Sequence, residues 1–323
     1  MKRRAVLAGA LAAAVRTTAR AEALTAMTIA TGVDPAFSQL YVAKEAGLFQ
    51  KNGLDVTINT GPSGSAMVPF LIGNQVQAAY GSDLAGVINH NVDRNVVAVA
   101  DGTLLLHWLS VIGRNVDNLD ALKGKRVGIA KGTGSEIFWA GVVKKFNLNP
   151  ADYKLVDLEA PEMVAALERG DIDAFATWEP WPTRARMGVS GAKTLVDAEG
   201  IYNNRNFVYM NRGWIEQNRE TAIRFMRALV EANDVIEKDR PAAAKMVSHF
   251  LNMPLNLATE LMPKVVYDMS WSDGALVTIK DSVELLTRQG KMKSPLDWNA
   301  YVYTDLVKAV RPVNVTITQL PPA

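Results

Sequence analysis

Residues 127–140 read V-G-I-A-K-G-T-G-S-E-I-F-W-A, and this stretch decides the fold. Residues 127–130 form a short apolar run that predicts a buried strand, and residues 131–134 are a glycine-rich break. Ser135 is a favourable N-cap and Glu136 follows it, so we expect a helix to begin there. Because the first amides of a helix lack internal partners and lie at the positive end of its dipole, this unit could hold an oxyanion.

Two nucleotide-binding motifs come close to this stretch without matching it. The dinucleotide fingerprint needs a third glycine where the chain has Ile137, and the P-loop needs its lysine after the glycines, whereas Lys131 precedes them. The alternative to a ligand site is an ordinary tight connection between a strand and a helix. The organisation of the rest of the chain favours a ligand site.

The same order of elements occurs twice in the chain. Each copy has three expected strands, and each strand is followed by a loop and a helix. The strands are expected at 27–31, 54–60, 76–80, 127–130, 154–158 and 172–176. When the copies are laid over each other, Asp83 falls opposite Glu179.

This repeated order predicts an α/β fold with two lobes. Alternating strands and helices build parallel sheets that are covered on both faces, so we expect a mostly parallel sheet flanked by helices in each lobe. In such sheets ligands bind outside the carboxyl ends of the strands, which predicts a ligand cleft between the lobes.

The remaining segments suggest where the lobes begin and end. Residues 96–114 read as two strands joined at 101–103, and we place the first crossing between lobes there. A last short strand is expected at 207–210, and the rest is helical in pattern, at 219–238, 241–251, 255–267, 274–289 and 300–310. We predict that lobe one comprises residues 24–105 and 212–323, and lobe two residues 106–211.

Residues 1–23 fit a secretory signal peptide. A basic start at Lys2, Arg3 and Arg4 precedes a small apolar segment and a cleavage site of small residues. Arg3-Arg4 leaves twin-arginine export open beside general secretion. No other stretch of the sequence is long and apolar enough to span a bilayer.

The composition excludes several classes of protein and site. The chain has no cysteine, which excludes disulfides, thiolate metal sites, a cysteine nucleophile and a lipid anchor. Cleavage after Ala21 would remove five of the 35 basic residues and no acid, leaving 30 against 33 acidic residues, about −3. No basic run remains, so we expect neither nucleic acid nor a membrane surface as a partner.

Several segments in order resemble the periplasmic binding proteins for aliphatic sulfonates, taurine and nitrate, which are the solute receptors of ABC importers. They are residues 41–49, 122–128, 131–135, 170–174 and 178–181. The resemblance covers nearly the whole chain after the signal peptide. It implies the type II periplasmic-binding-protein fold, closure of two lobes on a small-molecule ligand, and ABC permease and ATPase subunits as partners. We accordingly expect a soluble, periplasmic monomer.

The ligand loops of that family map onto five loops of this chain. The candidate ligand-binding residues in them are Asp34, Ser63, Gly64, Ser65, Ser82, Asp83, Gly132, Thr133, Gly134, Ser135, Trp178 and Glu179. The serine and glycine loops would offer amides to an anion or would only cap helices. Trp178 would form an apolar wall or belong to the core, and Asp83 or Glu179 would hold an ammonium group or cap a helix.

The sequence predicts binding without chemistry. His90, His107 and His249 have no acid or cysteine at metal spacing around them, so we expect no metal and no cofactor. The sequence has no G-x-S-x-G elbow, and a related precursor-forming enzyme uses a cysteine-rich motif that is absent here. The expected ligand is a small organic anion or zwitterion resembling a sulfonate or taurine. Nitrate, a pyrimidine precursor, an aromatic acid, or an enzyme on the same fold are the alternatives.

Overall fold

The computed structural model describes residues 23–322 of the chain. The predicted signal peptide therefore lies outside the described residues, except for Ala23. Within residues 23–322, no helix combines the length and the apolar character needed to cross a membrane.

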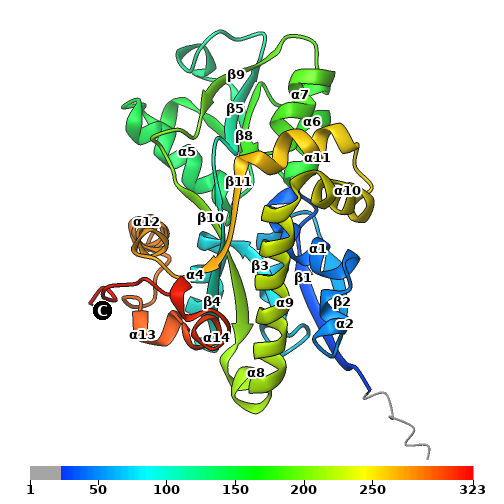
Figure 1. Ribbon diagram of the computed structural model, residues 1–323. Coiled ribbons are helices and arrows are strands. Elements are labelled where there is room, and N and C mark those ends of the chain that lie inside the picture. Colours follow the sequence, from blue (N-terminus) through cyan, green and yellow to red (C-terminus); the bar gives the residue numbers. More distant parts are fainter. Residues whose placement is uncertain (1–22, 323) are drawn as a thin grey trace, which may run out of the picture.

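The described strands form two separate sheets, which lie one above the other in Figure 1. The six-stranded sheet contains β1 (Thr25–Thr31), β2 (Leu54–Thr60), β3 (Ala78–Ser82), β4 (Val96–Leu105), β10 (Asn204–Asn211) and β11 (Val265–Ser270). The five-stranded sheet contains β5 (Leu109–Arg114), β6 (Arg126–Ile129), β7 (Lys154–Asp157), β8 (Ala174–Trp178) and β9 (Ala192–Asp197).

The two sheets repeat one strand order, which confirms the predicted α/β architecture. The orders are β2-β1-β3-β10-β4 and β7-β6-β8-β5-β9, and β11 extends the first sheet beyond β4. The first three strands of each order are parallel, whereas β10 and β5 run antiparallel to their neighbours. Both sheets are therefore mixed: four strands of each run in one direction, and β10 and β5, through which the chain enters from the other sheet, run against them.

Helices cover both sheets and extend the six-stranded unit. Those within the repeats are α1 (Ser38–Glu45), α2 (Leu48–Lys51), α3 (Gly64–Met67), α4 (Asp83–Val92), α5 (Gly134–Lys145), α6 (Ala160–Arg169) and α7 (Trp181–Gly188). The later ones are α8 (Arg212–Gln217), α9 (Arg219–Lys238), α10 (Arg240–Leu251), α11 (Leu255–Leu261), α12 (Asp273–Arg288), α13 (Trp298–Tyr301) and α14 (Asp305–Val310). The long α9 packs against α1, α10 and α14 beside the six-stranded sheet (Figure 1).

The structure corrects two elements that the sequence pattern had suggested. Residues 255–267 are not one helix, because α11 ends at Leu261 and the edge strand β11 begins at Val265. Residues 101–103 do not join two strands, because β4 runs through them to Leu105. A side chain at Gly102 would place its Cβ only 1.9 Å from the Tyr80 hydroxyl, so this glycine permits a close approach rather than a turn.

The chain passes between the sheets twice. The first passage is residues 106–108, between β4 and β5, and the second is residues 198–203, between β9 and β10. The predicted boundary at residue 211 differs from sheet membership, because β10 pairs with β3 and β4 of the six-stranded sheet. The division of the chain into two lobes otherwise stays a prediction.

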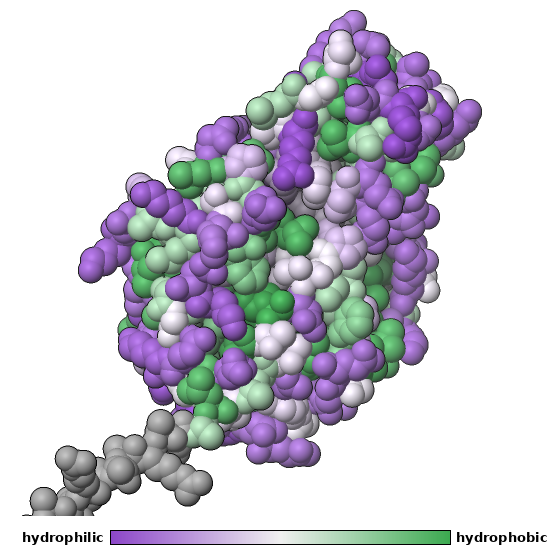
Figure 2. All heavy atoms as spheres, turned by 90° about the vertical axis from the view of Figure 1, so that its right-hand side faces the viewer, coloured by the Kyte–Doolittle hydropathy of each residue, from purple (hydrophilic) through white to green (hydrophobic). Residues whose placement is uncertain are grey.

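The central strands are buried from end to end. Every residue of β3 and of β8 is buried, as expected for strands that are covered on both faces. Seen from the side, the molecule is narrower at the end of the five-stranded sheet, where hydrophilic residues crowd the surface (Figure 2). The carboxyl ends of β3 and β8 meet in the middle of the molecule, and the candidate site lies there.

Candidate functional site

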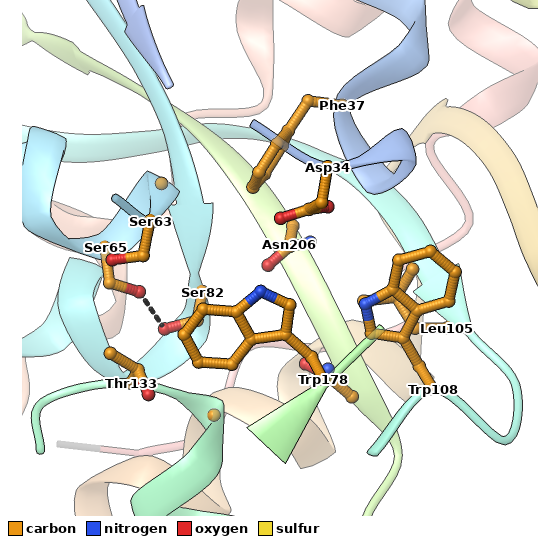
Figure 3. Close-up of a pocket in the computed structure, with 13 residues that line it drawn as sticks. Asp34, Phe37, Ser63, Ser65, Ser82, Leu105, Trp108, Thr133, Trp178 and Asn206 are labelled. Atoms are coloured by element: carbon orange, nitrogen blue, oxygen red, sulfur yellow. Dashed lines mark hydrogen bonds between the residues drawn. The ribbon is translucent and has the colours of Figure 1, made fainter. Parts of the chain in front are cut away.

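A small cavity lies between the two sheets, and both sheets contribute to its walls (Figure 3). Its lining residues are Asp34, Phe37, Ser63, Gly64, Ser65, Ser82, Leu105, Trp108, Thr133, Gly134, Trp178, Asn204 and Asn206. Its volume of about 30 Å³ leaves room for roughly two or three water molecules. The cavity as it stands is therefore smaller than a ligand with several non-hydrogen atoms.

One end of the cavity is a cluster of hydroxyl groups. Ser63 is the N-cap of α3 and accepts a hydrogen bond from the Ala66 amide at 3.1 Å. Ser65 and Ser82 share a hydrogen bond of 2.8 Å between their hydroxyl oxygens, which Figure 3 shows as a dashed line. On the facing wall lies Thr133, the N-cap of α5. The Thr133 hydroxyl donates to the Ala130 carbonyl at 2.7 Å, so the neutral donors left for an oxyanion are the Ser63 hydroxyl and the second hydroxyl hydrogen of the Ser65–Ser82 pair.

The other end of the cavity carries a buried carboxyl group. Asp34 is 4% exposed, and its Oδ1 accepts a hydrogen bond from the Ala36 amide at 2.9 Å. Burial raises the pKa of Asp34 to about 7, against the lowering effects of the Ala36 amide and the Trp178 indole. In Figure 3 the indole nitrogen of Trp178 faces this carboxyl group. Among the described residues, the lining contains no lysine, arginine or histidine.

Asparagine side chains from β10 complete the wall between the two ends. Asn204 and Asn206 are both buried, and Oδ1 of Asn204 has no hydrogen-bond partner among the described residues. A buried amide oxygen without a partner is costly, so a donor supplied by a ligand would stabilise this site.

Eight of the twelve candidate residues line the cavity, and four do not: Asp83, Gly132, Ser135 and Glu179. Ser135 is fully buried, and its hydroxyl donates to the Ala176 carbonyl at 2.5 Å while accepting from the Ala130 amide at 3.0 Å. It lies within α5 and joins β6 to β8, so the predicted N-cap role belongs to Thr133 instead.

Gly132 has a backbone reason to be glycine. Its φ of +72° is left-handed, and its amide donates to Glu136 Oε2 at 2.8 Å. That amide is already used within the loop.

Asp83 is satisfied by hydroxyl groups of the protein. Its carboxylate accepts hydrogen bonds from Tyr202 at 2.5 Å and from Ser282 of α12 at 2.6 Å. Burial is the largest influence on this carboxyl group and raises its pKa to about 6.

Glu179 joins the two sheets through an ion pair. It follows β8 directly and is 1% exposed, and its Oε1 accepts from Lys264 Nζ at 3.0 Å. Lys264 directly precedes β11 of the six-stranded sheet. Thr183 donates to the same carboxylate through its amide at 3.1 Å and its hydroxyl at 3.0 Å, and Arg186 lies 3.5 Å away.

Sequence reasoning missed five lining residues: Phe37, Leu105, Trp108, Asn204 and Asn206. Phe37 lies one turn beyond Asp34, Leu105 is the last residue of β4, and Trp108 is the last residue of the first passage between the sheets. Asn204 and Asn206 carried a signal, because residues two apart in a strand share one face, and they come just before the apolar run 207–210.

Comparison with known proteins gives one family match and several relatives. The family model described as NMT1/THI5 like matches residues 34–244. A binding protein of Brucella abortus (strain 2308) is 22% identical over 278 residues, which cover 83% of this chain and 86% of the relative. A protein of Bacillus subtilis (strain 168) described as an aliphatic sulfonates-binding protein is 25% identical over 214 residues, covering 63% and 64%.

Solved structures share the fold at low sequence identity. The alkanesulfonate-binding protein SsuA from Xanthomonas axonopodis pv. citri, bound to MOPS, has a TM-score of 0.75 at 19% identity, covering 87% of this chain and 99% of its own. The nitrate-binding protein NrtA from Synechocystis PCC 6803 has a TM-score of 0.72 at 15% identity, covering 90% and 89%. The desulfurization enzyme DSZB has a TM-score of 0.69 at 15% identity, covering 90% and 99%. The chain therefore has the periplasmic-binding-protein fold, which also occurs in an enzyme.

Proposed function

Since the chain belongs to the NMT1/THI5-like family, we propose that it is the periplasmic solute receptor of an ABC importer and binds a small zwitterion such as taurine. The ligand enters between two lobes, which close on it, and the closed form delivers it to a membrane permease. In this proposal the lobes correspond to the two sheets and their helices.

The observation that carries the proposal is the unequal chemistry of the two ends of the cavity. Serine hydroxyl groups and the glycines Gly64 and Gly134 lie at one end, and the buried Asp34 carboxyl group lies at the other (Figure 3). A sulfonate fits the first end, because it is a weakly basic oxyanion that accepts several hydrogen bonds. An ammonium group fits the second, because it would neutralise Asp34 in a site of low polarity.

Simple anions fit the site less well than a zwitterion. The described lining has no cationic side chain to balance an unpaired negative charge, and it contains an acid instead. Nitrate and a plain alkanesulfonate would leave the Asn204 oxygen without a donor and would bring no cation to balance Asp34. Trp178, Trp108 and Phe37 offer apolar surface to a short carbon chain, and their faces also favour a cation.

The lining residues support binding rather than catalysis. Ser63, Ser65 and Ser82 have no histidine, lysine or cysteine beside them in the described lining, and the carboxyl group of that lining, Asp34, lies at the other end of the cavity (Figure 3). The relatives named above are binding proteins, although DSZB is an enzyme on the same fold. We therefore infer that this chain is not an enzyme.

The ion pair between Glu179 and Lys264 supports a closing motion. The pair joins the end of β8 to the start of β11, so it forms only when the two sheets are close. We infer that this contact, together with the ligand, stabilises the closed form that a permease would recognise.

A thermal-shift comparison tests the ligand class. Taurine and isethionate share the ethanesulfonate skeleton and differ in an ammonium against a hydroxyl group, so they form a matched pair. We expect taurine to raise the melting temperature more than isethionate, nitrate, a pyrimidine or an aromatic acid at the same concentration. Asp34→Asn should abolish the difference between taurine and isethionate. Equal shifts from both compounds in the wild-type protein would reject the zwitterion.

A further inference from the structure

Side chains that could bind a metal ion converge where the chain passes between the two sheets. His107 lies on the first passage, Asp197 is the last residue of β9, and Glu199 lies on the second passage. One ligand atom from each of the three residues lies within 4.8 Å of the others. All three residues are exposed, so an ion could reach them from solvent.

The distance between His107 and Asp197 suits two ligands of a shared metal ion better than a direct hydrogen bond between them. His107 Nδ1 and Asp197 Oδ2 are 3.6 Å apart, which is too long for a strong hydrogen bond. Two ligands at about 2.1 Å from a tetrahedral zinc ion would be roughly 3.4 Å apart. The other oxygen of Asp197, Oδ1, accepts the Glu199 amide at 2.9 Å, which orients the carboxylate toward His107.

One cation lies close to this group. Lys145 Nζ donates to the Glu199 backbone carbonyl at 3.0 Å, and its charge would weaken the binding of a metal ion. The two carboxylates nevertheless carry more charge than the single ammonium group, and Lys145 bonds the backbone of Glu199 rather than its side chain.

We propose that His107, Asp197 and Glu199 form a site for a divalent transition-metal ion of the zinc class that joins the two passages between the sheets. Nitrogen and carboxylate oxygen are ligands that zinc accepts, and the exposure of the site leaves positions for water. The sequence predicted no metal because the two acids lie about 90 residues beyond the histidine.

The chain provides a matched control for this site. His249 and Glu45 form another exposed pair of a histidine and an acid, with Nδ1 and Oε2 2.7 Å apart, but with one carboxylate only. The third histidine, His90, is fully buried, and its Nδ1 contacts the Val96 carbonyl at 2.7 Å. Because the chain has no cysteine, the background of metal binding should be low.

The test is a calorimetric titration of Zn²⁺ into the exported protein, purified without an affinity tag. We expect about one ion per chain, an affinity at least about tenfold weaker in His107→Ala, and a weaker affinity in Asp197→Asn and Glu199→Gln. His249→Ala should bind as the wild type does. Retention of binding in His107→Ala, or an equal loss in His249→Ala, would overturn the site, and circular dichroism of each variant checks that it is folded.

Discussion

Two loops with the same layout face each other across the cavity, and their serines have different roles. Ser63-Gly64-Ser65 begins α3 in the first repeat, and Thr133-Gly134-Ser135 begins α5 in the second. The first residue of each triplet caps its helix. The third residue differs, because Ser65 bonds Ser82 at the cavity whereas Ser135 is buried between β6 and β8.

The middle glycines of these triplets also differ. A Cβ on Gly64 would lie 2.3 Å from the Tyr80 carbonyl oxygen and 2.6 Å from Phe37 Cζ. A Cβ on Gly134 would meet nothing nearer than Asn204 Oδ1, at 3.4 Å. Local sequence therefore determines which residue caps each helix, while the packing of neighbouring strands determines which positions are tightly constrained.

The largest expected effect is a difference in the free energy of unfolding between Gly64→Ala and Gly134→Ala. Gly64→Ala should lower the free energy of unfolding by about 4 kcal/mol or more, because backbone atoms cannot move aside as a flexible side chain can. Gly134→Ala should change it by less than about 1 kcal/mol, since a Cβ there would make only ordinary van der Waals contacts and alanine favours a helix. Urea denaturation of both variants measures the difference, and equal losses would contradict this account of the first loop.

The acids at matching positions of the repeats provide the next comparison. Glu179→Gln should lower the free energy of unfolding by about 3 kcal/mol, because it leaves Lys264 and Arg186 without their buried anion. Asp83→Asn should lose less, since the partners of Asp83 are neutral hydroxyl groups: the amide oxygen can accept from one of them, and the amide nitrogen can donate to the oxygen of the other. A loss in Asp83→Asn as large as that in Glu179→Gln would show that charge pairing is not what distinguishes them.

Substitution of Ser135 should mainly lower the stability of the protein, whereas substitution of Ser65 should mainly weaken ligand binding. Ser135→Ala removes the partner of a buried amide and a buried carbonyl, so we expect a loss of about 2 kcal/mol in the free energy of unfolding. Ser65→Ala should lose less than about 0.5 kcal/mol while weakening the binding of taurine. Unfolding and binding titrations on the same preparations check this, and a Ser65→Ala protein that binds normally would remove Ser65 from the site.

The pH dependence of binding tests the acidic end of the cavity. The pKa of Asp34 is raised to about 7, so the group is mostly neutral at pH 6 and mostly ionised at pH 8. Because an ammonium ligand favours the ionised form, the affinity for taurine should rise about tenfold, or ~1.4 kcal/mol, between these pH values. Calorimetry across this range measures the rise, and Asp34→Asn should remove it.

The sequence predicted the parts of the site that belong to the repeat. Ser63 and Thr133 follow repeated strands and Trp178 ends one, and ligands bind outside the carboxyl ends of such strands, so the place of these residues at the cavity could be foreseen. Asn204 and Asn206 could not be placed, because β10 returns antiparallel from the other sheet. The partners of Asp83 and Glu179 could not be predicted from the repeat either, since Ser282 and Lys264 lie in the non-repeated C-terminal part.

The edge strand β11 was missed for a related reason. Residues 265–270 alternate between buried and exposed positions up to Met269, which is the pattern of a half-buried strand. A preceding helical segment and the shortness of the strand made a longer helix the simpler interpretation. These residues form a strand because they pair with the edge of β4, and that edge exists only once the sheet has assembled.

The central claim is that the ligand binds in the cavity beside Trp178, and calorimetric titration of taurine into two tryptophan variants tests it most directly. Trp139 is the control, because it is buried in α5 against Tyr153 and lies outside the cavity lining. We predict that Trp178→Ala weakens binding about tenfold or more with a small change in melting temperature, whereas Trp139→Ala melts earlier but binds normally once folded. A Trp178→Ala protein that melts far below the wild type yet binds taurine normally would contradict the claim.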